Sequence, residues 1–393
     1  MAMKIGILYE KYRLSGIVST DTRKITPGSL FFALKGANFN GNAFAAEALD
    51  KGAAYAVVDE PAYATDDRFL LVDNVLQALQ YLARHHRRQL TVPVFAMTGS
   101  NGKTTTKELI QRVLGARFRT YATRGNLNNY IGLPLTLLSV PADTEIIVLE
   151  MGSNRIGDIA ELAAVCEPTH GLITNIGKAH LEGFGGLEGV KRGEGELYDW
   201  FARHGGTVFA NSQNEILREM LAERNLQAVT YPAPGDSLHC TLESFAPVVV
   251  YRDENGQRVE THLPGKHNFE NIAAALCVGK HFGVPGAEAN AAVAGYVSEN
   301  NRSQTVRRGS NTVLLDAYNA NPTSMQASLE YFAALDVPNK VVILGDMAEL
   351  GPDGPDEHRR IGEVAAAGRF AKVLLCGPLM QNAVAANPLA YYF

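Results

Sequence analysis

Residues 94–114 read VFAMTGSNGKTTTKELIQRVL: a short apolar run, a glycine-containing turn and a segment with helical periodicity. Glycines allow a tight turn whose backbone N–H groups face phosphate oxygens, and the start of the following helix adds a favourable dipole. The pattern is shorter than the usual G-x-x-x-x-G-K-[ST] loop, because Met97 stands where that loop has its first glycine. The stretch therefore predicts a strand, a phosphate-binding loop and a helix. The ATP-binding residues expected in the loop are Gly99, Ser100, Asn101, Gly102, Lys103, Thr104 and Thr105.

Four side chains have a predicted chemical role around this loop. Lys103 can neutralise β- and γ-phosphate charge as a catalytic residue, and the Thr104 hydroxyl can bind Mg²⁺. Glu150 ends a later predicted strand, and His180 follows the next one. Ligands of open α/β sheets bind at the carboxyl ends of strands, so we expect both to act as catalytic residues and metal ligands. The alternatives are a solvated strand-end carboxylate and a surface or core histidine.

Apolar runs of strand length recur on both sides of this unit and alternate with helical segments. Such alternation indicates a parallel α/β sheet. The expected strands are 30–34, 54–58, 69–72, 145–149, 171–175, 207–210, 312–315, 340–344 and 372–375, with a helix over 76–88 and β-structure with turns over 232–263. We predict an α/β fold with three domains, at residues 1–88, 89–295 and 296–393.

Composition and charge argue against several classes of protein. The chain has 393 residues and a formal net charge of -5 without a basic patch, so we expect no nucleic-acid partner. The four cysteines lie far apart without a C-x-x-C pair, which argues against a disulfide framework or a zinc site. The sequence has no signal-peptide core and no apolar run near the ~20 residues of a membrane span. We therefore expect a cytoplasmic protein without membrane contact.

Several further motifs accompany the loop in a characteristic order. They are TDTR at 20–23, GSLFFALKG at 28–36, NLNNYIGLP at 126–134, EMGSN at 150–154, GKHNFEN at 265–271, DAYNANP at 316–322 and LGDMAELG at 344–351. With this ordered series the chain resembles the Mur ligase family, which joins amino acids or peptides to UDP-N-acetylmuramic acid precursors. The resemblance covers nearly the whole chain. Several of the motifs are similar in particular to the members that add D-alanyl-D-alanine.

The resemblance implies an N-terminal α/β domain for the UDP end of the substrate, a central parallel-sheet ATPase domain and a C-terminal Rossmann-like domain. It implies a monomer that uses ATP and two Mg²⁺ ions to ligate D-alanyl-D-alanine to UDP-N-acetylmuramoyl-tripeptide, through an acyl phosphate, in peptidoglycan precursor synthesis. The further ATP-binding residues that it implies are His267, Asn268, Asn271, Arg302, Asp316 and Asn319. The substrate residues that it implies are Ser19, Asp21, Thr22, Arg23, Asn126, Asn128, Asn129, Asn154, Arg155 and Asn321. Residue by residue, the alternatives are turns at 126–129 and 321–322 and a strand-end salt bridge at 21–23.

Glu194 is the main departure from the family pattern. The family usually carries at this position a lysine that is carbamylated and lies near the second Mg²⁺. In a helix, Glu194 shares a stripe with Val190 and Leu197, and a glutamate on an apolar stripe needs a metal or cation as partner. We expect Glu194 to replace the carbamate as a catalytic residue and metal ligand, which would free the enzyme from dependence on CO₂. The open alternative is a surface carboxylate in a shifted register, with Lys191 or another group near the metal.

Other departures concern substrate contacts and the third domain. Asn40 and Asn42 stand where the family commonly has Asp and His, and Arg155 where it often has His. The chain lacks the Lys-Gly-Ser-Arg stretch that the family usually carries near its end, so we expect a third domain without its usual last elements. Three other functions stay open: a ligase that adds one amino acid to a muramoyl peptide or glutamate to folate, a P-loop kinase, and a nucleotide-gated binding module without turnover.

Overall fold

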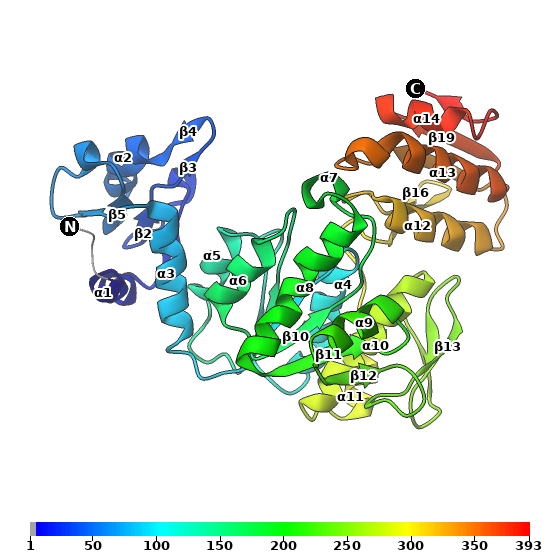
Figure 1. Cartoon of the computed structure of the whole chain (residues 1–393), viewed down its shortest axis with the longest axis horizontal. Helices are drawn as coiled ribbons and strands as arrows, with labels where there is room; N and C mark the ends of the chain where they lie inside the picture. Colours follow the sequence, from blue (N-terminus) through cyan, green and yellow to red (C-terminus); the bar gives the residue numbers. More distant parts are fainter. Residues whose placement is uncertain (1–4) are drawn as a thin grey trace. The chain divides into compact units, whose positions relative to one another are not determined.

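A computed structural model describes residues 5–393, which form two compact units; Figure 1 shows the order of their elements. The first unit comprises the described residues up to Phe95, together with Tyr121–Met151 and Ala160–Thr169. The second unit comprises the other described residues. In the described part of the chain, no helix is long and apolar enough to cross a membrane.

A four-stranded parallel sheet forms the N-terminal part of the first unit. Its strands, in the order in which they are hydrogen-bonded, are β1 (Val18–Ser19), β2 (Leu30–Phe32), β5 (Tyr55–Val58) and β6 (Phe69–Leu71). The same part holds α1 (Ile5–Ser15), α2 (Ala45–Asp50), α3 (Val75–Arg87) and the antiparallel hairpin β3–β4 (Lys35–Gly36, Phe39–Asn40). Phe31, Leu49 and Val58 belong to its buried core. The three strands and the helix predicted in this region are confirmed.

A six-stranded sheet with the order β12-β11-β10-β7-β9-β8 forms the middle of the chain. Its strands are β7 (Val94–Thr98), β8 (Thr120–Ala122), β9 (Ile146–Glu150), β10 (His170–Ile173), β11 (Thr207–Asn211) and β12 (Ala228–Tyr231). The helices of this region are α4 (Lys103–Gly115), α5 (Gly132–Leu137), α6 (Asp158–Cys166), α7 (Leu181–Phe184), α8 (Leu187–His204), α9 (Glu215–Glu223), α10 (Lys266–His281) and α11 (Gly286–Ala294). Strands β10, β11 and β12 pair in parallel. Every residue of β7 and β9 is buried, as is typical of parallel strands covered on both faces.

The stretch that was predicted as β-structure with turns forms a separate antiparallel sheet. Its strands are β13 (Thr241–Ser244), β14 (Val250–Arg252) and β15 (Arg258–Glu260). The predicted turn between the last two strands is present, because the Asp253 carboxylate accepts hydrogen bonds from the backbone N–H groups of Asn255 and Gln257, both at 2.9 Å.

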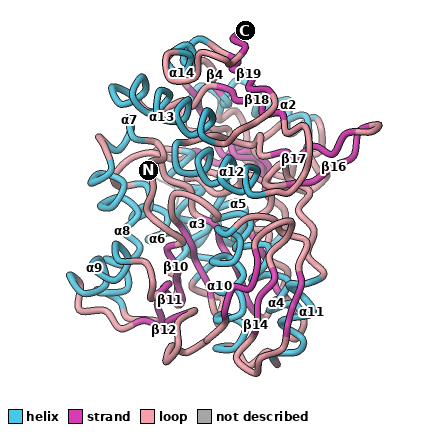
Figure 2. The backbone as a smooth tube through the Cα atoms, turned by 90° about the vertical axis from the view of Figure 1, so that its right-hand side faces the viewer, coloured by secondary structure: helices cyan, strands magenta, loops and turns pink. Residues whose placement is uncertain are grey.

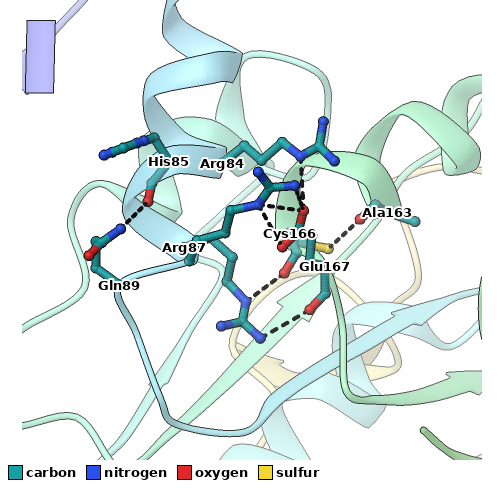
Figure 3. Close-up of polar contacts among 8 residues, drawn as sticks. Arg84, His85, Arg87, Gln89, Ala163, Cys166 and Glu167 are labelled. Carbon is teal, nitrogen blue, oxygen red and sulfur yellow. Dashed lines mark hydrogen bonds and ion pairs between the residues drawn. The ribbon is translucent and has the colours of Figure 1, made fainter. Parts of the chain in front are cut away.

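The carboxyl end of helix α3 carries several basic residues, and Figure 3 shows the polar contacts around them. Arg84 and Arg88 form ion pairs with the Glu167 carboxylate, at 2.9 and 2.7 Å. The buried Arg87 donates to the carbonyl oxygens of Cys166 and Glu167, at 2.8 and 3.0 Å. The last carbonyls of a helix lack intrahelical partners, so Arg87 caps the end of helix α6.

Helix α4, which begins in the loop, is fixed by its packing against helix α10. A Cβ atom added at Gly279 of α10 would lie 2.3 Å from Val113 Cγ1 of α4, so this close approach requires glycine. Thr106 Oγ1 of α4 also donates a hydrogen bond to Asn271 Oδ1 of α10, at 3.0 Å. These contacts set the direction in which the N-terminus of α4 points.

The C-terminal part of the second unit contains a hairpin and a parallel sheet (Figure 2). Its strands are β16 (Gln304–Arg308), β17 (Asn311–Leu315), β18 (Val341–Gly345), β19 (Lys372–Cys376) and β20 (Tyr391–Tyr392), and its helices are α12 (Pro322–Ala334), α13 (Gly354–Ala367) and α14 (Gln381–Val384). The predicted strands at 312–315, 340–344 and 372–375 are confirmed. The first of them pairs antiparallel with β16, because a two-residue turn containing Gly309 in the left-handed region joins Arg308 to its partner Asn311.

Candidate active site

The loop after β7 has the backbone conformation that its glycines allow. Gly99 and Gly102 have φ angles of 128° and 80°, which side chains rarely tolerate. A Cβ added at Gly99 would lie 2.2 Å from Thr174 Oγ1, so there is no space for one either. Lys103, the first residue of α4, extends back over the loop, where its Nζ donates to the Gly99 carbonyl and, at 3.4 Å, to that of Ser100. The predicted strand, phosphate-type loop and helix are therefore present, with Lys103 over the loop.

The residues after β10 hold the loop in place. Ser100 N donates to Asn175 O, and Asn101 N donates to Asn175 Oδ1, both at 3.0 Å. Thr174 Oγ1 donates to Asn101 O at 2.7 Å, and Gly177 N donates to Ser100 Oγ at 2.8 Å. This supporting role of 174–177 was not predicted. The available signal was its position at the carboxyl end of the predicted strand 171–175, which belongs to the same sheet.

Glu194 lies at the base of the loop and is only 2% exposed. Its Oε2 atom accepts from Thr98 Oγ1 at 2.5 Å and from Gly99 N at 3.1 Å, and its Oε1 atom accepts from Ser153 Oγ at 3.0 Å. The predicted helix stripe is confirmed, because Val190 and Leu197 are buried together with Glu194 on α8. Lys191 points elsewhere and forms ion pairs with α9, at 3.5 and 3.6 Å. This register favours Glu194 over Lys191 as the group at the site, while its role as a metal ligand stays a prediction.

Glu150 ends β9, as predicted, and is 2% exposed. Its Oε1 atom accepts a hydrogen bond from Asn128 Nδ2 at 2.8 Å, and its backbone N–H donates to Thr123 Oγ1 at 3.0 Å. The first unit therefore brings a predicted metal ligand and a predicted substrate residue together. Asn129 instead supports the turn interpretation of its segment, since its Oδ1 atom accepts from the N–H groups of Ile131 and Gly132.

His180 precedes helix α7 and has a φ angle of 51°, in the left-handed region. Its Nδ1 atom forms a hydrogen bond with the carboxylate of Glu349, a contact that the sequence analysis did not anticipate. Non-glycine residues in this region cost ~1–3 kcal/mol and concentrate at functional sites. The contact and the backbone conformation fix the direction of the imidazole ring.

The side chains predicted to bind the metal suit Mg²⁺, which takes only some of its ligands from the protein. Among residues 5–393, no three His, Cys, Asp or Glu side chains form a ready metal-binding group. Mg²⁺ usually binds through one or two carboxylates, waters and substrate phosphates. The buried carboxylate of Glu150 is a donor of this kind, and the Thr104 hydroxyl at the start of α4 is a second oxygen donor. The role of the His180 imidazole as a metal ligand stays a prediction.

The residues that the resemblance implied for ATP fall into two groups. In the first group, two side-chain amides at the start of α10 form hydrogen bonds with each other and with a residue before the helix. Asn271 Nδ2 donates to Asn268 Oδ1 at 2.9 Å, and Asn268 Nδ2 donates to Pro264 O at 2.7 Å. In the second, His267 Nε2 lies 3.4 Å from Ser303 Oγ, and Ser303 N donates to Asp316 Oδ1 at 3.2 Å. Burial lowers the pKa of His267, which keeps the ring neutral at physiological pH. The second group joins α10 to the hairpin of the C-terminal part.

Three further residues of the C-terminal part have contacts near these groups. The Arg302 guanidinium lies 3.9 Å from the centroid of the Tyr318 ring, a cation–π contact. Asn321 is the N-cap residue of α12 rather than part of an isolated turn, and its Nδ2 atom also donates to Asn101 Oδ1 of the loop at 2.7 Å. Its role in substrate binding stays a prediction. Asn319 is exposed and accepts from the neighbouring Ala320 N–H.

The residues implied for the nucleotide sugar lie in the first unit, beside β1. Arg23 and Asp21 form the salt bridge that was the alternative to a substrate role, at 2.8 Å, and hydrogen bonds from Arg23 lower the pKa of Asp21 to about 2. Ser19 Oγ donates to Asp21 O at 3.2 Å, while Thr22 begins the short helical turn that Asp21 caps. This turn fixes the backbone, and the Arg23 side chain remains largely exposed.

The remaining predicted substrate residues lie in two places: Asn154 and Arg155 in the turn before α6, and Asn126 in the segment before α5. Arg155 Nε donates to Asp158 Oδ1 at 2.9 Å, and Asn154 N donates to Asp158 Oδ2 at 2.9 Å. The Asn154 side chain and the whole of Asn126 are exposed, with no protein contact that assigns them a role. Their part in substrate binding stays a prediction.

The sheet, the glycine-containing loop and the buried Glu194 carboxylate bonded to that loop define a nucleotide-dependent α/β enzyme. Three family models match the chain: "Mur ligase family, catalytic domain" over residues 16–87, "Mur ligase middle domain" over 97–279 and "Mur ligase, glutamate ligase domain" over 301–391. The chain belongs to the Mur ligase family.

Similar proteins share nearly the full length of the chain. The UDP-N-acetylmuramoyl-tripeptide–D-alanyl-D-alanine ligase of Bacillus subtilis is 34% identical over 384 residues, which cover 94% of this chain and 82% of the relative. The Escherichia coli ligase of the same name is 34% identical, with 96% and 84% covered. Among solved structures, MurF from Acinetobacter baumannii has a TM-score of 0.88 at 29% identity, covering 96% of this chain and 83% of that one. MurF ligase from Thermotoga maritima in complex with ADP has a TM-score of 0.85 at 26% identity, with 96% and 88% covered.

Proposed function

We propose that the chain is an ATP-dependent ligase that joins D-alanyl-D-alanine to UDP-N-acetylmuramoyl-tripeptide, in the synthesis of peptidoglycan precursors. The observation that carries the proposal is the loop at 98–105, with Lys103 over it, in a chain that matches ligases of this name over nearly its whole length. The MurF neighbour in complex with ADP supports ATP as the nucleotide.

In the proposed reaction, the terminal carboxylate of the tripeptide attacks the γ-phosphorus of ATP, and ADP leaves. The amine of D-alanyl-D-alanine then attacks the acyl carbon, an amide bond forms, and phosphate leaves. The loop N–H groups and Lys103 hold the phosphates and stabilise the charge on the transferring group. Thr104, Glu150 and His180 would hold Mg²⁺, which when bound stabilises negative charge on the phosphate oxygens.

Glu194 has two tasks in this proposal. It anchors the first residues of the loop through Thr98 and Gly99, and it supplies the carboxylate that a carbamylated lysine supplies elsewhere in the family. A genetically encoded carboxylate needs no CO₂. Since both oxygens already accept hydrogen bonds from the protein, we expect contact with a second Mg²⁺ to use the remaining lone pairs or a bridging water.

The other parts of the proposal concern the domains and the setting of the enzyme. Residues 1–88 bind the UDP end of the substrate, 89–295 bind ATP and 296–393 close over it. Asp21, Arg23 and Asn128 are the proposed substrate contacts with the best-defined surroundings. The enzyme acts as a monomer in the cytoplasm, where its nucleotide substrates are made.

Phosphate release tests the proposal. The chain is incubated with ATP, Mg²⁺ and UDP-N-acetylmuramoyl-tripeptide, with and without D-alanyl-D-alanine. The proposal predicts release that needs both substrates, with single amino acids inactive. Release with a single amino acid would indicate a related ligase, phosphorylated substrate without free phosphate would indicate a kinase, and nucleotide binding without turnover would indicate a binding module.

A further inference from the structure

The segment 174–184 connects the phosphate loop with the C-terminal part of the second unit. Its first residues, 174–177, bond to the loop at Ser100 and Asn101 as described above. Its remaining residues, 178–184, carry His180 and helix α7. The partners of this second half lie in the C-terminal part.

Apolar packing attaches the second half of the segment to the C-terminal part. Leu181 and Phe184 of α7 are each 4% exposed and belong to one buried cluster. That cluster also contains Met347 and Leu350, which follow β18, and Ile361 of α13. Helix α7 has four residues, too short to be stable alone, so this packing determines where it lies.

Polar contacts add to the same attachment. Lys178 Nζ forms an ion pair with Glu357 at 2.6 Å, and the Glu357 side chain is only 9% exposed. Lys178 N donates to Thr323 Oγ1 at 3.2 Å. Glu182 N donates to the backbone carbonyl of Glu349 at 3.0 Å. His180 is therefore flanked on both sides by residues bonded to the C-terminal part.

His180 and Glu349 form the polar contact at the centre of this group. Both have positive φ angles, 51° and 61°, although neither is glycine. Such a backbone conformation is unfavourable for a residue with a side chain and persists only when its surroundings enforce it. The Glu349 carboxylate can only accept, so the proton of the neutral imidazole sits on Nδ1 and the lone pair on Nε2.

We propose that Glu349 is a positioning residue for His180, so that the C-terminal part of the enzyme sets the orientation and tautomer of this imidazole. The inference rests on the proposed function, in which His180 would be a ligand of Mg²⁺. A carboxylate on the far nitrogen of a metal-binding histidine fixes its ring and raises its basicity, and removing such a partner costs ~10–100-fold in affinity or activity. The C-terminal part would thereby orient His180 through Glu349, in addition to closing over the nucleotide as proposed above.

The test compares Glu349→Ala and Glu349→Gln with Glu363→Ala in the full chain. Glu363 is a matched control, because its side chain is 55% exposed against 54% for Glu349 and its ion pair, with Arg359, lies within α13. Glu349→Ala is expected to lower kcat at least ~10-fold, with the KM for ATP changed much less. Glu349→Gln keeps an acceptor oxygen and is expected to recover most of the loss, while Glu363→Ala leaves kcat unchanged.

Two further readouts separate positioning from a general effect on folding. In a double-mutant cycle, Glu349→Ala is expected to have almost no further effect on kcat once His180 is replaced by Ala. In ligand-free protein labelled with ¹⁵N in its histidines, the His180 ring is expected to carry its proton on Nδ1 in the wild type, and to lose this preference in Glu349→Ala. An unchanged tautomer in Glu349→Ala, or additive losses in the cycle, would overturn the inference. Since the NMR measurement needs no substrate, an inactive wild type would count against the proposed function alone.

Discussion

Replacement of Glu194 by Gln tests the anchor of the phosphate loop. The carboxylate is 2% exposed and accepts hydrogen bonds from Thr98, Gly99 and Ser153. A hydrogen bond to a charged group contributes ~1.5–3 kcal/mol, against ~0.5–1.5 kcal/mol for a neutral pair. Gln has the same shape, and its single carbonyl oxygen can serve Thr98 and Gly99 while its amide faces Ser153. The change therefore removes mainly the charge, at ~1 kcal/mol per bond, or ~3 kcal/mol in all.

Trp200 gives a direct assay of this prediction. It is the chain's single tryptophan and lies on α8, the helix that carries Glu194. Urea unfolding is followed by the fluorescence of Trp200. We expect the free energy of unfolding of Glu194→Gln to be about 3 kcal/mol lower than that of the wild type. The control Glu188→Gln, at an exposed position of the same helix, is expected to lose less than ~1 kcal/mol. Equal small losses in the two variants would refute the anchor.

Three further predictions concern CO₂, the loop and the sugar-nucleotide turn. Added bicarbonate should leave ligation rates unchanged and Lys191→Met should remain active, because the carboxylate of α8 is encoded and Lys191 pairs with α9; a rate that rises with bicarbonate and vanishes in Lys191→Met would contradict this. Gly99→Ala should weaken ATP binding at least about tenfold by calorimetry, since its Cβ would lie 2.2 Å from Thr174 Oγ1, and unchanged affinity would contradict the loop geometry. By NMR titration, the pKa of Asp21 should lie at about 2 and return toward 3.8 in Arg23→Ala. The contribution of the pair to folding stability is therefore present above pH 3.8 and lost as pH falls through about 2. An Asp21 pKa that is the same in both proteins would contradict the pair.

The sequence predicted the elements that depend on local pattern. Short apolar runs bounded by turns became strands, and residues 99–102 form the turn between β7 and α4 as expected. The stripe of α8 was also predictable, because spacing alone places Glu194 and Val190 on one face. The pairing of β17 was not predicted, since strand length and hydrophobicity carry no information about the partner strand.

The contacts of the site depended on tertiary structure and could be predicted only in part. Lys103 and the loop glycines were predictable, because their spacing along the chain sets their geometry. The hydrogen bonds that Ser153 donates to Glu194 and that join His180 to Glu349 link residues 41 and 169 positions apart. No local pattern links such residues, so these partners became visible only once the chain was folded.

Oxygen transfer from substrate to phosphate tests the central claim most directly. UDP-N-acetylmuramoyl-tripeptide labelled with ¹⁸O in its terminal carboxylate is incubated with ATP, Mg²⁺ and D-alanyl-D-alanine, and the released phosphate is examined by mass spectrometry. An acyl phosphate requires that each phosphate released carries one ¹⁸O atom, because the attacking carboxylate oxygen leaves with the phosphorus. Phosphate without ¹⁸O, or amide product without phosphate, would contradict ligation through an acyl phosphate.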